Sequence, residues 1–119
     1  MARHVLAVLS NPTDGNDDEY NAWYDDTHLA DVLTVPGFVA ARRFALAAPV
    51  PGQDGPAQRY LAIYEVESDD LPGAIHALIQ AGARMDISPT YDLNSTVMWS
   101  FTELASKERD AVAKEASRA

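Results

Sequence analysis

Apolar residues along the chain fall into four short runs that are typical of β-strands. These runs are "HVLAVL" at residues 4–9, "FVAARRFALA" at 38–47, "RYLAIYEVE" at 59–67 and "TVMWSFTEL" at 96–104. They are rich in β-branched or aromatic residues, and clusters of Pro, Gly, Asn and Asp separate them. The pattern therefore predicts four strands, the middle two forming a hairpin with a long loop.

Two further segments carry helical spacing. Asn16 can cap a first helix from about residue 17 to 33, with Glu19 completing a capping box. That helix must end before Pro36, and Gly37 then lets the chain turn with a positive φ angle. Apolar residues at helical spacing predict a second helix over 69–85.

The element order β-α-β-β-α-β predicts an α+β, ferredoxin-like fold. In this fold an antiparallel four-stranded sheet carries both helices on one face. We assign residues 1–103 to this domain and residues 104–119, which are Ala-rich and charged, to an extra C-terminal helical tail. Strand residues on the other face are also largely apolar, so we expect a homodimer packed sheet on sheet.

Composition excludes several classes of function. The chain of 119 residues has 18 acidic and 9 basic side chains, and its net charge of -9 repels nucleic acids and anionic membranes. It has no Cys, and its N-terminal apolar run is too short for a signal peptide, so we expect a cytoplasmic protein. No calcium loop, phosphate-binding loop or nucleophile elbow occurs, and we predict no metal site.

The stretch "WYDDTHLADVLTVPGF", residues 23–38, carries the candidate chemistry. On a helix, one sector of about 140° holds both aromatic and polar residues, which suits a pocket better than a dry core. Tyr24 and His28 are four residues apart and Asp31 follows three later, so the carboxylate can orient the imidazole as a general base requires. The alternative is a half-buried His28 that is bonded for structural reasons alone.

Arginines and aromatics on the strands are further candidates. Arg42 and Arg43 are adjacent, so only one can face the helices, where it could hold a substrate carboxylate or phenolate or pair with an acidic residue. Tyr60 and Tyr64 share one strand face, and Trp99 shares its strand face with Val97 and Phe101. These aromatics belong either to the core and dimer interface or to a slot for an aromatic ligand.

The segment "EYNAWYDDTHLADVLTVPGFVAARRF", Glu19 to Phe44, resembles the EthD-like branch of the dimeric α+β barrel superfamily. The resemblance rests on Trp-Tyr, a His four residues after the Tyr, Pro-Gly-Phe and Arg-Arg-Phe, and the element order agrees over about residues 3–103. It implies a cavity between helices and sheet that is lined by His28. Relatives such as the polyketide cyclases carry a His near the start of the first strand, so His4 is a candidate for the same cavity.

The resemblance leaves the reaction open, because the superfamily includes cofactor-free cyclases, isomerases, monooxygenases, haem enzymes and accessory proteins. Our hypothesis is an enzyme without cofactor that acts on an aromatic, polyketide-like or lactone-like metabolite by general acid/base chemistry, as a cyclase, isomerase or lyase. His28 would transfer the proton, Tyr24 would donate a hydrogen bond and Asp31 would orient His28. The proposed substrate-binding residues are His4, Tyr20, Trp23, Arg42, Arg43, Tyr60, Tyr64 and Trp99. The alternatives are a cofactor-free monooxygenase of a dihydroxyaromatic, a histidine-ligated haem protein and a non-catalytic binding protein.

Overall fold

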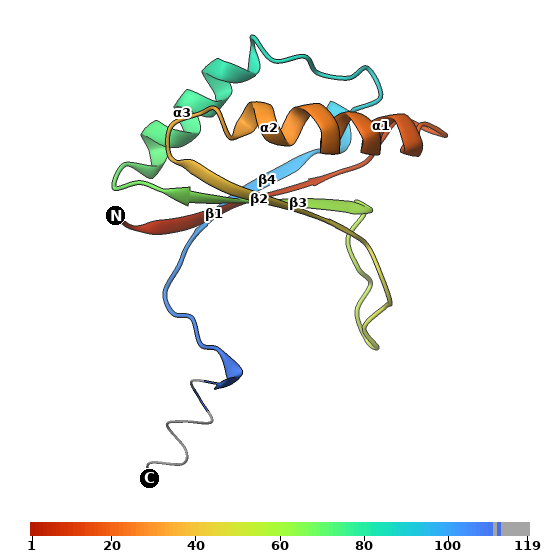
Figure 1. Cartoon of the computed structure of the whole chain (residues 1–119). Helices are drawn as coiled ribbons and strands as arrows, with labels where there is room; N and C mark the ends of the chain where they lie inside the picture. Colours follow the sequence, from red (N-terminus) through yellow and green to blue (C-terminus); the bar gives the residue numbers. More distant parts are fainter. Residues whose placement is uncertain (111, 113–119) are drawn as a thin grey trace.

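The computed structural model describes residues 1–110 and 112, and it confirms the predicted α+β, ferredoxin-like class (Figure 1). Strands and helices follow in the predicted order. Their bounds are β1 (Arg3–Ser10), α1 (Asp17–Trp23), the π-helical turn η1 (Tyr24–His28), α2 (Leu29–Val32), β2 (Phe38–Ala45), β3 (Tyr60–Glu67), α3 (Leu71–Gly82), the 3₁₀ turn η2 (Leu93–Ser95) and β4 (Val97–Thr102).

The four strands form one antiparallel sheet in the order β2-β3-β1-β4. Leu6 of β1 lies opposite Tyr64 of β3 on one side and Ser100 of β4 on the other. Figure 1 shows the helices over one face of this sheet, whereas the β2–β3 connection and the chain after β4 extend beyond the opposite face. The helices and the sheet therefore enclose the core between two layers.

The first helix runs from residue 17 to 32 as predicted, but it contains one widened turn. The Leu29 amide donates to the Tyr24 carbonyl five residues earlier, which defines η1, and the Leu33 amide returns to α-helical bonding with Leu29. The predicted capping box is wrong. The Asn16 side chain donates to the Thr13 hydroxyl instead and makes no cap to the helix.

Gly37 forms the turn into β2 with a φ of 93°, which confirms the positive angle expected after Pro36. Its carbonyl accepts a hydrogen bond of 2.8 Å from the Glu67 amide, which ties the start of β2 to the end of β3. A Cβ atom at residue 37 would lie 3.3 Å from the Glu67 carbonyl oxygen. Both the angle and this close approach favour glycine here.

The two faces of the sheet differ in burial. The side toward the helices buries Leu6, Val8, Tyr64 and Val66. The opposite face carries large exposed apolar side chains, of which Trp99 is 66% exposed. The sheet therefore leaves an apolar face uncovered, as the alternation of the strands predicted.

The predicted helical tail at 104–119 lies partly outside the described residues. Residues 103–108 follow β4 without regular structure, and 109, 110 and 112 are helical. No helix in the part of the chain that the structure describes is long and apolar enough to cross a membrane.

Candidate functional site

A cavity of about 330 Å³ lies between the helices and the sheet. Its walls come from η1 and α2, from α3, from the connection between α3 and β4, and from β1, β3 and β4. Among the described residues that line it, the polar atoms belong to His28, Trp23 and three tyrosines, Tyr24, Tyr64 and Tyr91, and the other lining residues are aliphatic residues, methionines and a glycine. No charged side chain is part of this described lining, so the cavity suits a neutral, mostly apolar molecule.

The widened turn η1 brings His28 against Trp23. Residues five apart in an α-helix are about 140° apart around the axis, whereas a π-turn places them nearly above one another. The two rings accordingly stack, with centroids 4.6 Å apart and planes inclined by 24°. The Tyr24 ring meets the His28 imidazole edge-on at 5.1 Å. This turn thus fixes three cavity-lining rings relative to one another.

The Nδ1 atom of His28 is buried and has no hydrogen-bond partner among the described residues. Burial lowers the pKa of His28 below its ordinary value of 6.5, the Asp31 carboxylate opposes this shift, and the Arg43 charge adds to it. The imidazole is therefore neutral at physiological pH. A neutral imidazole with a free nitrogen can accept a proton or a hydrogen bond from a ligand.

The tyrosines of the cavity are held in the protonated form. The Tyr64 hydroxyl is buried and has no partner at hydrogen-bond geometry in the described structure, although the Tyr24 hydroxyl lies close enough to interact with it, and burial raises the pKa of Tyr64 to about 12. Burial also raises the pKa of Tyr24. Both groups consequently remain neutral hydrogen-bond donors at physiological pH.

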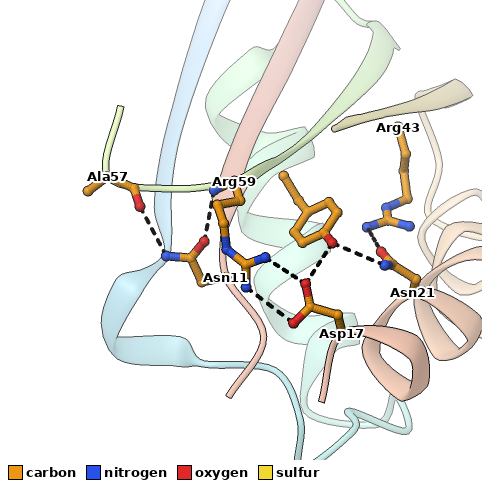
Figure 2. A network of polar contacts seen from close by, with 7 residues as sticks. Asn11, Asp17, Asn21, Arg43, Ala57 and Arg59 are labelled. Atoms are coloured by element: carbon orange, nitrogen blue, oxygen red, sulfur yellow. Dashed lines mark hydrogen bonds and ion pairs between the residues drawn. The ribbon is translucent and has the colours of Figure 1, made fainter. Parts of the chain in front are cut away.

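Arg43 supports the site from behind. Its guanidinium lies 4.3 Å from the centre of the Tyr24 ring and donates to the carboxylate of Asp25 at 2.7 Å and the side-chain oxygen of Asn21 at 2.8 Å. Figure 2 shows Arg43 directed at Asn21. As the strand alternation predicted, Arg42 faces the other way, over Phe44. Arg43 thus pairs with Asp25 and does not line the cavity.

Tyr60 belongs to a polar network at the start of α1. Figure 2 labels Asn11, Asp17 and Arg59 of this network. Its hydroxyl donates to the Asp17 carboxylate at 2.8 Å, which also accepts from Arg59 at 2.6 Å. Hydrogen bonds from Arg59 and then Tyr60 lower the pKa of Asp17. Asn11 extends the network by donating to the Ala57 carbonyl. The network ties α1 and the β2–β3 connection to the sheet, and Tyr60 lies outside the cavity lining.

Two predicted partners of His28 lie elsewhere. Asp31 borders a separate depression beside α3, together with Thr34 and Arg84, and it does not bond the Nδ1 of His28. His4 shares the buried face of β1 as predicted, but the Ser68 carbonyl accepts from its Nε2 and the Thr102 hydroxyl bonds its Nδ1, each at 2.9 Å. Both ring nitrogens of His4 therefore have structural partners.

Tyr20 and Trp99 also lie outside the cavity lining. Tyr20 is fully buried behind Tyr24, with its hydroxyl bonded to Ser10. Trp99 points to the uncovered face of the sheet, and its neighbour Met98 lines the cavity. Alternation along β4 places Met98 on the face opposite to Trp99, so the sequence alone could have indicated Met98 as a cavity residue. Tyr91, in the connection before β4, carried no such signal.

Solved structures share this fold. An EthD-like protein from Ralstonia eutropha JMP134 is 19% identical with a TM-score of 0.64, covering 92% of this chain and 98% of its own. The chain shares the fold of the EthD-like proteins. A dimeric ferredoxin-like protein of unknown function from Jannaschia sp. CCS1 is 9% identical with a TM-score of 0.55 over 83% and 97% of the two chains. A heme-degrading protein from Mycobacterium tuberculosis, solved with two hemes in its active site, is 20% identical with a TM-score of 0.58 over 88% and 99% of the two chains.

Neither the models of known protein families nor the curated proteins contain a match. The predicted resemblance to EthD-like proteins is confirmed at the level of the fold by the solved structures. Identities of this size do not transfer residue roles, so the chemistry must be inferred from the cavity itself.

We predict that His28 makes the protein less stable in acid. Because burial lowers the pKa of folded His28, the unfolded chain binds a proton more readily below about pH 6.5, and protonation favours unfolding. Between about pH 7 and pH 5, the free energy of unfolding should therefore fall more for the native protein than for the variant His28→Gln. Chemical denaturation at each pH measures both values. If native protein and variant lose the same free energy of unfolding, His28 titrates as if exposed. The variant His76→Gln, at an exposed helix position, is the matched control.

Proposed function

We propose that this protein binds a small, planar, largely apolar metabolite bearing a hydroxyl or carbonyl group, and that His28 moves a proton on it. The observation that carries the proposal is the pair of unpartnered polar atoms, Nδ1 of His28 and the hydroxyl of Tyr64, on residues that line one apolar cavity. Buried polar groups are otherwise almost always paired. A ligand that pairs them would recover a stabilising interaction that the free protein lacks.

The proposed chemistry is proton transfer next to a carbonyl group, without a cofactor. The neutral imidazole of His28 takes a proton from the carbon beside the carbonyl, and the electron pair moves to the carbonyl oxygen. The phenols of Tyr24 and Tyr64 donate hydrogen bonds to that oxygen as its charge develops, and the low polarity of the cavity strengthens these bonds. Return of the proton from the imidazolium to a different carbon completes an isomerisation. In a cyclase, the enolate carbon would instead form a bond to a second carbonyl carbon of the same molecule, and the imidazolium would protonate the resulting alkoxide.

Heme fits this cavity poorly. Each heme carries two propionate carboxylates, whereas the described lining contains no Arg or Lys to pair with them. The cavity of about 330 Å³ is also near the lower end of the range for small-molecule sites, roughly 300–1,000 Å³. The chemistry of the fold neighbour from Mycobacterium tuberculosis therefore does not enter the proposal.

A non-catalytic binding protein is the second candidate, and the same cavity favours it. Asp31 does not bond His28, so the imidazole lacks the carboxylate that strengthens many general bases. Binding without turnover would use the same two unpartnered atoms.

We also propose that the protein is a homodimer that packs through the uncovered face of the sheet. Trp99, Phe101 and Phe44 expose large apolar surfaces on this face, which a second copy would remove from water. The fold neighbour from Jannaschia sp. is a dimeric protein, which supports the proposal.

We predict that ligand binding depends on these two polar groups. The probes are 2-naphthol and naphthalene, which share a ring system and differ by one hydroxyl. A neutral hydrogen bond contributes about 1 kcal/mol, so 2-naphthol should bind about fivefold more tightly than naphthalene. The variants His28→Phe and Tyr64→Phe each keep an aromatic ring but remove the polar atom, and each should reduce this preference, as measured by calorimetry.

The matched control for these variants is Tyr60→Phe, which removes a hydroxyl from the Asp17 network outside the cavity. It should leave the preference unchanged. If the two probes bind equally to the native protein, or if all three variants behave alike, His28 and Tyr64 do not recognise the ligand.

For the dimer we expect sedimentation velocity to give twice the mass of one chain at micromolar concentration. Trp99→Lys places a charge on the uncovered face and should give monomers. Gln80→Lys, at an exposed position of α3 on the helical side of the sheet, is the comparison variant and should stay dimeric. A native monomer would contradict the proposed packing.

A further inference from the structure

Four large apolar side chains both line the cavity and reach solvent. They are Ile79, Ile87, Leu93 and Met98, which are 65%, 38%, 71% and 57% exposed. We call this group the apolar collar. Its members come from α3, the following connection, η2 and β4. Because each is at once a wall residue and a surface residue, the collar marks the mouth of the cavity.

The composition of the collar is unusual for a mouth that opens to water. Pockets for compact polar metabolites place polar groups at the entrance, whereas these side chains leave apolar surface in solvent. The collar continues the apolar lining outward. A ligand that ended inside the cavity would leave the collar exposed, so the collar suits a ligand whose apolar part extends through it.

An extended chain fits the collar better than a protein or a membrane does. A stable protein interface buries at least about 1,200 Å² in total, and four side chains around an opening do not supply such an area. The net charge of -9 repels an anionic membrane surface. A linear aliphatic chain passing through the opening contacts all four side chains at once.

We propose that the ligand carries a linear alkyl chain, which leaves the cavity through the apolar collar while its polar ring lies at His28 and Tyr64. The placement of the ring rests on the proposed function. The placement of the chain rests on the collar alone. The substrate class is thus an alkyl-substituted phenol or cyclic ketone.

The test uses phenol, 4-butylphenol and 4-octylphenol as probes in calorimetric titrations of the full chain. Affinity should rise about two- to fourfold for each added methylene that the collar covers, since a fully buried methylene contributes about 0.8 kcal/mol. In the double variant Ile79→Asn/Leu93→Asn the gain per methylene should fall below half of the native value. Both positions are largely exposed, so the fold should tolerate the change.

The matched control is Leu46→Asn/Val50→Asn, which makes the same replacements at exposed positions in the β2–β3 connection. It should keep the native gain per methylene. Affinity that does not rise with chain length, or that rises equally in the collar variant, overturns the inference. So does a change of oligomeric state in the collar variant alone, because a second copy would then cover the collar.

The two proposals fail in different ways. If phenols bind and His28→Phe weakens them while chain length has no effect, the proposed function stands and the alkyl chain is rejected. If affinity rises with chain length in the native protein and the variant His28→Phe alike, the alkyl chain stands and recognition by His28 is rejected. If none of the three phenols binds, both are rejected.

Discussion

The widened turn at Tyr24–His28 is the feature on which the rest of the site depends. One additional residue in the helical turn places His28 over Trp23 instead of about 140° away from it. The stacked rings then form one wall of the cavity, and Arg43 packs behind Tyr24 to hold that wall against the sheet. A regular α-helix through the same sequence would direct the imidazole to a different side of the helix.

The cavity combines polar and apolar groups in a way that costs stability in the free protein. A buried donor or acceptor without a partner loses its hydration and gains nothing in return. Nδ1 of His28 and the Tyr64 hydroxyl are both in this state among the described residues, whereas His4, Tyr20 and Tyr60 have bonded partners. The hydrogen-bonded side chains stabilise the fold, whereas the two groups without hydrogen bonds remain available to a ligand.

The sequence predicted the element order and which residues of a strand share a face, because alternation and helical spacing depend only on local geometry. It also predicted that Arg42 and Arg43 face opposite sides of the sheet, and that Tyr24 and His28 lie on the same side of the first helix. It did not predict the widened turn, because no pattern in the sequence marks one. It also assigned Asp31 to His28 from helical spacing, although the Nδ1 atom of His28 has no hydrogen-bond partner among the described residues.

Some contacts were not predicted because their partners are distant in the sequence. His4 bonds to Ser68 and Thr102, and Trp23 donates to the Asp86 carbonyl 63 residues away. No local pattern encodes such contacts. The connection before β4, which supplies Tyr91 and Leu93 to the cavity, lacks periodicity altogether, so its role appears only in the folded chain.

The central claim is that the Nδ1 atom of His28 is free in the unliganded protein and contacts the ligand when one binds. Nitrogen NMR of ¹⁵N-labelled histidines during addition of 2-naphthol tests it most directly. The account predicts that addition of 2-naphthol shifts the Nδ1 resonance of His28, while the ring nitrogens of His4, which already have partners, and of exposed His76 stay in place. An unchanged Nδ1 resonance of His28 at saturating 2-naphthol, or equal shifts at all three histidines, would contradict it.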